Sequence, residues 1–98
     1  MTATPAEIVL YGRPGCHLCD DTHALLEALL AKRAAAGLLA PTLVVRSIEG
    51  HAALEARYHL VIPVVTFGGR ELQLAIRPSE VVRFVTDALD GVAAGTER

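Results

Sequence analysis

Short apolar runs separated by glycine and proline predict alternating strands and helices in the first half of the chain. Residues 8–11, Ile-Val-Leu-Tyr, are strand formers that end at the loop Gly12-Arg13-Pro14-Gly15. Apolar residues then recur at helical spacing until Gly37, which predicts a helix over about residues 17–36. A second strand is predicted over residues 41–48, where consecutive apolar residues indicate burial on both faces.

The second half of the chain continues with a short helix, a hairpin and a final helix. Residues 51–58 favour a helix, and residues 61–67 form the most strand-like run in the chain. Pro63 should begin that strand, because proline cannot donate to a sheet ladder. A glycine turn then leads into a strand over residues 70–76. Pro78 opens the last helix, which should fray after residue 92 and whose predicted buried stripe is Val81, Val82, Val85, Ala88, Leu89 and Val92.

The order of these elements predicts an α/β fold. Strands separated by helices need parallel crossovers, whereas the glycine hairpin adds an antiparallel pair. We therefore expect a four-stranded mixed sheet in the order β-α-β-α-β-β-α, with helices on both faces. The 98 residues contain no repeat or linker, so residues 1–98 should form one domain. Folding should bury about 64% of the surface of the extended chain.

Composition and charge exclude several classes of partner. Nine Lys and Arg against eleven Asp and Glu leave a net charge of −2, so binding of nucleic acid through its phosphates is not expected. No apolar run approaches the roughly 20 residues that cross a bilayer, and the first residues do not resemble an export signal. Two cysteines three positions apart are not a secreted disulfide framework. We expect a monomeric protein of the reducing cytoplasm, with no membrane partner.

The two cysteines carry the candidate chemistry. Cys16-His17-Leu18-Cys19 lies where the first loop meets the first helix. Unpaired amides and the partial positive charge of a helix N-terminus stabilise an anion, so we expect the pKa of the Cys16 thiol to be lowered. Cys19, one turn further on, could attack a mixed disulfide on Cys16 and close the ring. This pattern predicts Cys16 as the nucleophile and Cys19 as the resolving thiol.

Neighbouring side chains could tune the pair. Arg13 could add positive charge near Cys16 or meet a carboxylate of a thiol substrate. His17, when protonated, could stabilise the thiolate and adjust the redox poise, although it could equally be a spacer that faces solvent. Asp20 and Asp21 oppose the thiolate, and we expect the helix terminus and Arg13 to outweigh them.

Two other interpretations of the cysteines remain open from the residues alone. Cys16, Cys19 and His23 have spacings of three and four residues on one helix face, so they could contribute to a zinc or copper site of a metal-binding or metal-delivery module. No local fourth ligand is present, and we expect no bound metal. The cysteines could also be an ordinary buried pair in a domain that serves only for interaction.

Two segments together resemble a known family. The run from Tyr11 to Cys19, together with Val61-Ile62-Pro63-Val64-Val65 before the glycine turn, resembles the glutaredoxin branch of the thioredoxin superfamily over nearly the whole chain. It looks closest to short bacterial glutaredoxin-like proteins of unassigned role. The resemblance implies a cis-proline at Pro63 beside the cysteines, and a backbone at Ile62 that pairs with a substrate strand. It also implies a substrate-binding role for Arg13.

The chain departs from the glutathione-using members of this family. Those members commonly place Pro-Tyr between the cysteines and a glycine pair before the last helix, whereas this chain has His17 and Leu18, and no glycine over residues 74–80. We therefore expect no resident cofactor and leave glutathione open as a co-substrate. The expected function is a thiol–disulfide oxidoreductase that reduces protein disulfides or glutathione mixed disulfides, with an unidentified reductant. A glutaredoxin-like protein that bridges an iron–sulfur cluster between two chains is a further alternative.

Overall fold

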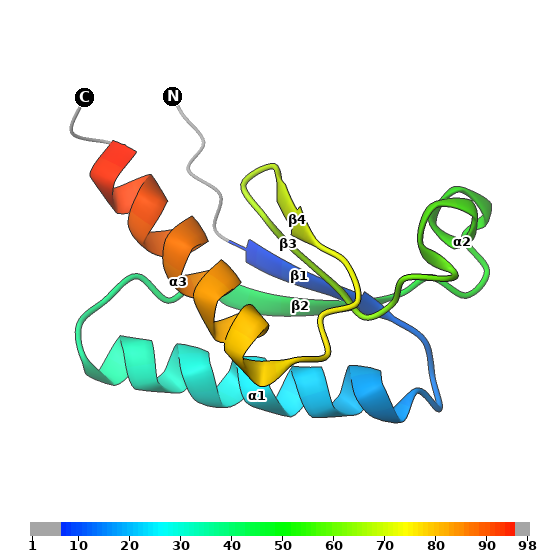
Figure 1. Ribbon diagram of the computed structural model, residues 1–98, viewed down its shortest axis with the longest axis horizontal. Coiled ribbons are helices and arrows are strands. Elements are labelled where there is room, and N and C mark those ends of the chain that lie inside the picture. Colours follow the sequence, from blue (N-terminus) through cyan, green and yellow to red (C-terminus); the bar gives the residue numbers. More distant parts are fainter. Residues whose placement is uncertain (1–6, 96–98) are drawn as a thin grey trace.

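A computed structural model describes residues 7–95, with side chains up to residue 91. Four strands and three helices follow the predicted order (Figure 1). The sheet order is β2-β1-β3-β4; β1 and β2 are parallel, and the other two pairs are antiparallel. The elements are β1 (Glu7–Gly12), α1 (His17–Ala35), β2 (Thr42–Ser47), α2 (Ala52–Tyr58), β3 (Val64–Phe67), β4 (Arg70–Leu72) and α3 (Pro78–Gly95).

The main hydrophobic core lies between the sheet and the two long helices, α1 and α3, which cover the same face (Figure 1). Alternation along β1 directs Ile8 and Leu10 into this core, where both are almost fully buried. Leu26 of α1 and Leu89 of α3 meet them with no exposed surface. The side chains that alternate along β1 and those that recur at helical spacing on α1 therefore pack into one apolar layer.

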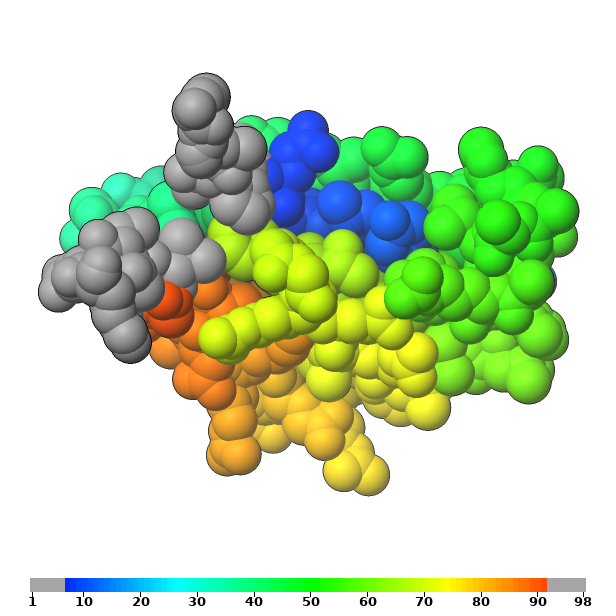
Figure 2. Space-filling model, turned by 90° about the horizontal axis from the view of Figure 1, so that it is seen from above, coloured from blue at the N-terminus to red at the C-terminus, as the bar shows by residue number. Residues whose placement is uncertain are grey.

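The opposite face of the sheet is covered only near one end. Tyr58 of α2 packs there with Ile48 and Val64 in a small separate cluster. Seen from this side, atoms of β1 lie at the surface beside α2 rather than beneath it (Figure 2). Helices on both faces are therefore confirmed, but the two layers differ greatly in extent.

The burial predicted for β2 is wrong. Its residues are exposed or half-buried, and Val45 keeps 53% of its surface exposed. The physical reason is topological, because β2 is an edge strand and has a neighbouring strand on one side only. A run of apolar residues could not distinguish an edge strand from a central one.

The last strand and the last helix also differ from prediction. The strand predicted over residues 70–76 ends at Leu72, because the backbone turns at Leu74 with a φ of 50° and the next residues bond to the loop before β3. In α3, Val82 is 38% exposed and not part of the buried stripe, since it lies beside Val81 on the helix and points away from the sheet. The side chain of Val92 lies outside the described part. The helix continues to Gly95, so fraying directly after residue 92 is wrong.

No helix within residues 7–95 has both the length and the apolar character needed to cross a bilayer.

Candidate active site

Cys16 and Cys19 form a disulfide at the start of α1, with Cα atoms 5.2 Å apart. Cys16 is the N-cap residue, and its extended backbone lets its Sγ accept a hydrogen bond from the amide of Cys19 at 3.1 Å. The sulfur of Cys16 therefore occupies the position where a helix stabilises negative charge. Cys16 is half-buried, whereas Cys19 is only 6% exposed. An incoming disulfide would meet Cys16 first.

Gly12, at the end of β1, allows the inner cysteine to pack this closely. A Cβ atom built on Gly12 would lie 2.8 Å from the Sγ of Cys19 and 3.0 Å from its Cβ. Real side chains do not approach so closely, so any larger residue would displace Cys19 or the strand. The sequence pattern predicts Gly12 only as the start of a turn. Its position four residues before the first cysteine was the available signal.

Pro63 follows a cis peptide bond from Ile62. Tyr11 pairs with Val64 in the antiparallel β1–β3 register, so the next step along each strand brings Gly12 and Pro63 opposite each other. The cis-proline loop therefore lies at the same sheet end as Cys19, which contacts Gly12. β3 begins at Val64, so the prediction that Pro63 begins this strand is wrong by one residue; proline has no amide hydrogen to donate to a sheet ladder, and Pro63 lies just before the strand.

Ile62 presents a backbone suited to an added strand. The carbonyl of Val61 accepts from Leu74, and the carbonyl of Pro63 accepts from Ala75, both at 2.8 Å. Between these two, no backbone group within residues 7–95 bonds to that of Ile62. The side chain of Ile62 is half-buried against the small cluster under α2. Its role in substrate binding stays a prediction, with the geometry in its favour.

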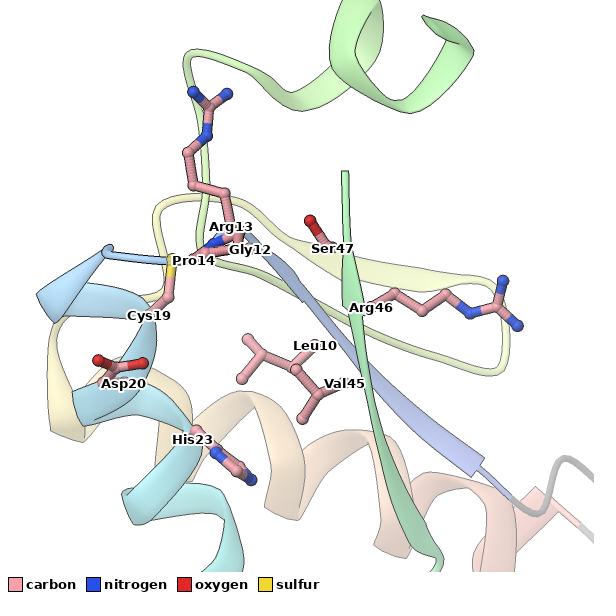
Figure 3. Close-up of a pocket in the computed structure, with 10 residues that line it drawn as sticks. All are labelled: Leu10, Gly12, Arg13, Pro14, Cys19, Asp20, His23, Val45, Arg46 and Ser47. Atoms are coloured by element: carbon pink, nitrogen blue, oxygen red, sulfur yellow. The ribbon is translucent and has the colours of Figure 1, made fainter. Parts of the chain in front are cut away.

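The two basic residues predicted near the cysteines lie at the surface. Arg13 accepts a hydrogen bond from the amide of Cys16 through its carbonyl at 3.3 Å. Its side chain is exposed and extends away from Cys19 (Figure 3). His17 is also exposed, as the first residue of α1. The structure therefore brings Arg13 and His17 to the same corner without a direct contact to either sulfur.

A hollow of about 320 Å³ reaches Cys19 from the side of β2, opposite the cis-proline loop. Its floor is formed by Leu10 and Val45, which lie side by side between α1 and β2 (Figure 3). His23 borders it one turn of helix beyond Cys19. Because β2 is partly exposed, an open space lies between this strand and Cys19.

The arrangement of ionisable groups does not favour the metal alternative. Within the described residues, no three His, Cys, Asp or Glu side chains are placed to share a metal ion. His23 is instead paired with Glu27, its Nε2 lying 3.3 Å from a carboxylate oxygen. Cys16 and Cys19 bond to each other.

Tyr58 connects α2 to the hairpin next to this site. Its hydroxyl donates to Glu71 of β4 at 2.8 Å, and its ring lies 5.0 Å from that of Tyr11. Burial raises the pKa of Tyr58 above its ordinary value of 10.0, and the hydrogen bond to Glu71 and the charge of that carboxylate raise it further. Tyr58 therefore remains a neutral hydrogen-bond donor at physiological pH.

The whole arrangement matches a known family of domains. Residues 7–88 match the glutaredoxin-like domain family (DUF836). The chain belongs to the glutaredoxin-like domain family. This confirms the resemblance inferred from the two cysteines and the cis-proline segment. No curated protein matches this glutaredoxin-like chain.

Solved structures agree with this assignment. The X-ray structure of the Northeast Structural Genomics target XcR50 from X. campestris is 30% identical, covers 83% of this chain and 97% of its own, and has a TM-score of 0.65. The solution NMR structure of Ne2328 from Nitrosomonas europaea is 30% identical, covers 87% of this chain and 95% of its own, and has a TM-score of 0.62. A solution structure of XcR50 is 29% identical, covers 83% of this chain and 94% of its own, and has a TM-score of 0.61. The glutaredoxin-like protein thus has a thioredoxin-like α/β fold.

Proposed function

We propose that this glutaredoxin-like protein is a thiol–disulfide oxidoreductase. The observation that carries the proposal is the Cys16–Cys19 disulfide at the N-terminus of α1, with one sulfur partly accessible and the other buried. A pair that only stabilised the fold would need neither this asymmetry nor a helix terminus at the outer sulfur. The bonded pair is the oxidised state of the proposed catalytic cycle.

The cycle begins from the reduced dithiol. The thiolate of Cys16 attacks one sulfur of a substrate disulfide, forms a mixed disulfide, and releases the other substrate sulfur as a thiolate. Cys19 then loses its proton to solvent, and its sulfur attacks Cys16, which forms the Cys16–Cys19 disulfide and releases the second substrate thiolate. Two electrons pass to the substrate. An external dithiol in a reducing cytoplasm would return the protein to the reduced state.

The surroundings of the cysteines favour a protein substrate. Large apolar side chains are exposed between the cysteines, where Leu18 keeps 50% of its surface, and on the segment before the cis-proline, where Leu60 keeps 78%. Leu74 and Ile76 add two more on the segment that bonds to the cis-proline loop. Exposed apolar groups around a reactive centre suit an apolar polypeptide segment better than a small charged peptide. A substrate segment could pair with the free backbone of Ile62.

Glutathione has less support as the preferred substrate. Arg77, the cation just before α3, already pairs with Glu80 at 3.7 Å. Pro78 opens that helix and has no amide hydrogen to offer a carboxylate. The positions that hold the γ-glutamyl end in glutathione-using relatives are therefore poor in donors here.

Single-cysteine variants test the proposal. With dithiothreitol as donor, insulin reduction by the wild-type protein should be lost in Cys16→Ser, because the attacking sulfur is gone. Cys19→Ser, reduced beforehand and mixed with insulin after dithiothreitol has been removed, should form a mixed disulfide that persists, because the protein has no second thiol to displace it. Non-reducing electrophoresis and intact mass would detect that adduct.

The two variants control each other, since each keeps one cysteine and loses the disulfide. Full insulin reduction by Cys16→Ser, or an adduct on Cys16→Ser and none on Cys19→Ser, would contradict the assigned roles. An inactive wild-type protein that forms no adduct with any disulfide would contradict the oxidoreductase itself.

A further inference from the structure

The hydroxyl of Thr22 makes a hydrogen bond to a residue distant in sequence, and this bond has no part in the proposed reaction of Cys16 and Cys19. Thr22 lies on the inner face of α1, one turn beyond Cys19, and is 4% exposed. Its Oγ1 donates to the carbonyl of Ala75 at 2.6 Å, across 53 positions of sequence. A threonine inside a helix commonly bonds to a carbonyl of its own preceding turn. Thr22 bonds instead to the segment between β4 and α3.

The peptide groups of Ala75 connect this hydroxyl to the cis-proline loop. The amide of Ala75 donates to the carbonyl of Pro63 at 2.8 Å, while its carbonyl accepts from Thr22. Ala75 and Pro63 are both fully buried. One residue therefore ties the helix that carries both cysteines to the loop that carries the cis-proline.

Leu74 adopts a conformation that leucine rarely takes. Its φ of 50° lies in the left-handed region, which is unfavourable for a residue with a Cβ. Its amide donates to Val61 and its carbonyl accepts from Ile76, both at 2.8 Å. Such a conformation persists only where the surrounding structure determines it, and such residues cluster at functional sites. Here it turns the chain out of β4 so that Ala75 can reach both Thr22 and Pro63.

We propose that Thr22 is a positioning residue that sets the place of the cis-Pro63 loop relative to Cys16 and Cys19. This inference rests on the proposed oxidoreductase function. Thr22 touches neither sulfur in a hydrogen bond nor the free backbone of Ile62, so it acts only through Ala75. Without its hydroxyl, the carbonyl of Ala75 loses its buried donor, and the loop can shift against the helix. The cysteines would keep their own chemistry, while a polypeptide docked along Ile62 would lose register with Cys16.

Thr22→Val tests this role, because valine keeps the shape and removes the hydroxyl. The KM for insulin should rise by about fivefold, the scale of one lost hydrogen bond, while kcat changes by less than about twofold. Reduction of bis(2-hydroxyethyl) disulfide, which is too small to use the loop, should stay within about twofold of wild type. Thr22→Ser keeps the donor and should restore the wild-type KM. Thr86→Val, on half-buried Thr86 of α3, makes the same chemical change away from the loop and should alter neither substrate.

Amide hydrogen exchange supplies a readout that does not depend on activity. The amides of Leu74 and Ala75 should exchange at least about fivefold faster in Thr22→Val than in wild type or Thr22→Ser. Equal losses on both disulfides, or a KM and exchange rates like those of Thr86→Val, would overturn the positioning role. If the wild-type protein reduced neither substrate, the oxidoreductase proposal would fail separately. Exchange at Leu74 and Ala75 would then decide whether Thr22 holds the loop.

Discussion

The two faces of the sheet are built in different ways. Beneath α1 and α3 lies the larger hydrophobic cluster, whose buried side chains come from β1, β3, both long helices and Ala75. On the other face, Ile48, Tyr58 and Val64 are the only residues of the described part that are buried together, and Tyr58 donates a hydrogen bond to Glu71 beside them. The second face ends next to the cis-proline loop, with Val61 and Ile62 at its margin.

The larger cluster should provide most of the stability, whereas the proposed site lies beside the smaller one. Burial of apolar surface contributes most of the stability of a domain, so the face under the two long helices should dominate the free energy of unfolding. The small cluster under α2 buries only three residues among the described ones, and Val61 and Ile62 beside Pro63 stay partly exposed at its margin. The proposed substrate site thus lies at the margin of a well-packed core, where local motion does not unfold the domain.

The largest expected effect lies in the main core. Leu26→Ala should lower the free energy of unfolding by about 3 kcal/mol, because fully buried Leu26 would leave a cavity between α1 and the sheet. Leu38→Ala, on a residue 51% exposed, should change it by less than about 0.5 kcal/mol. Urea denaturation of both variants measures the contrast. Equal effects would mean that the long helices do not carry the stability.

Gly12→Ala tests the close packing of β1 against Cys19. The added methyl group would press on Cys19, and we expect a loss of about 2 kcal/mol together with slower closure of the Cys16–Cys19 disulfide. Gly69→Ala is a suitable control, because its φ of 87° makes alanine unfavourable although nothing lies within 4 Å of the added atom. It should lose stability without affecting the disulfide. Thiol titration during reoxidation follows closure, and similar rates in the two variants would refute the steric role of Gly12.

Arg33 is a buried charged residue in the last turn of α1, 7% exposed, and its variants sharpen the comparison. Its side chain donates to the carbonyl of Leu39 at 2.7 Å and to Asp90 at 2.9 Å, so it ties α1 to the following loop and to α3. Arg33→Met should cost about 1.5 kcal/mol in thermal or urea unfolding. Asp90→Asn should cost less than about 1 kcal/mol, because Asp90 is 54% exposed and water screens its charge. A larger cost for Asp90→Asn would mean that the ion pair, rather than the bond to Leu39, fastens the helices.

Tyr58→Phe, in the smaller cluster, should have the smallest effect. Loss of the hydrogen bond to Glu71 should reduce stability by about 1 kcal/mol near neutral pH. Because folding raises the pKa of Tyr58 above 10.0, the wild-type protein should lose stability as the pH rises above about 10, where the unfolded chain releases this proton first. Unfolding measured between pH 8 and pH 11 should show a smaller alkaline loss in Tyr58→Phe. Parallel pH curves for the two proteins would contradict this role.

Much of the fold and part of the site could be predicted from local signals. The helical spacing after Leu18 located α1 to within one residue at its end, and the glycine turn located the β3–β4 hairpin. The exposed edge position of Val45 and the outward direction of Val82 could not be found in this way, because both depend on which neighbour covers a strand or helix. Gly12 was visible in the sequence as a turn residue, and Thr22 lies within the helix predicted over residues 17–36. Their contacts with Cys19 and Ala75 were not visible.

By itself, the amino-acid sequence determined the order of the elements, the placement of two cysteines at a helix start and the proline before β3, because periodicity, helix capping and proline geometry are local properties of the chain. Tertiary structure decided how deeply each sulfur is buried, why Gly12 can bear no side chain, and how Thr22 and Ala75 join the helix to the loop at Pro63. These features arise from contacts between residues distant in sequence, and such contacts exist only once the strands and helices pack together.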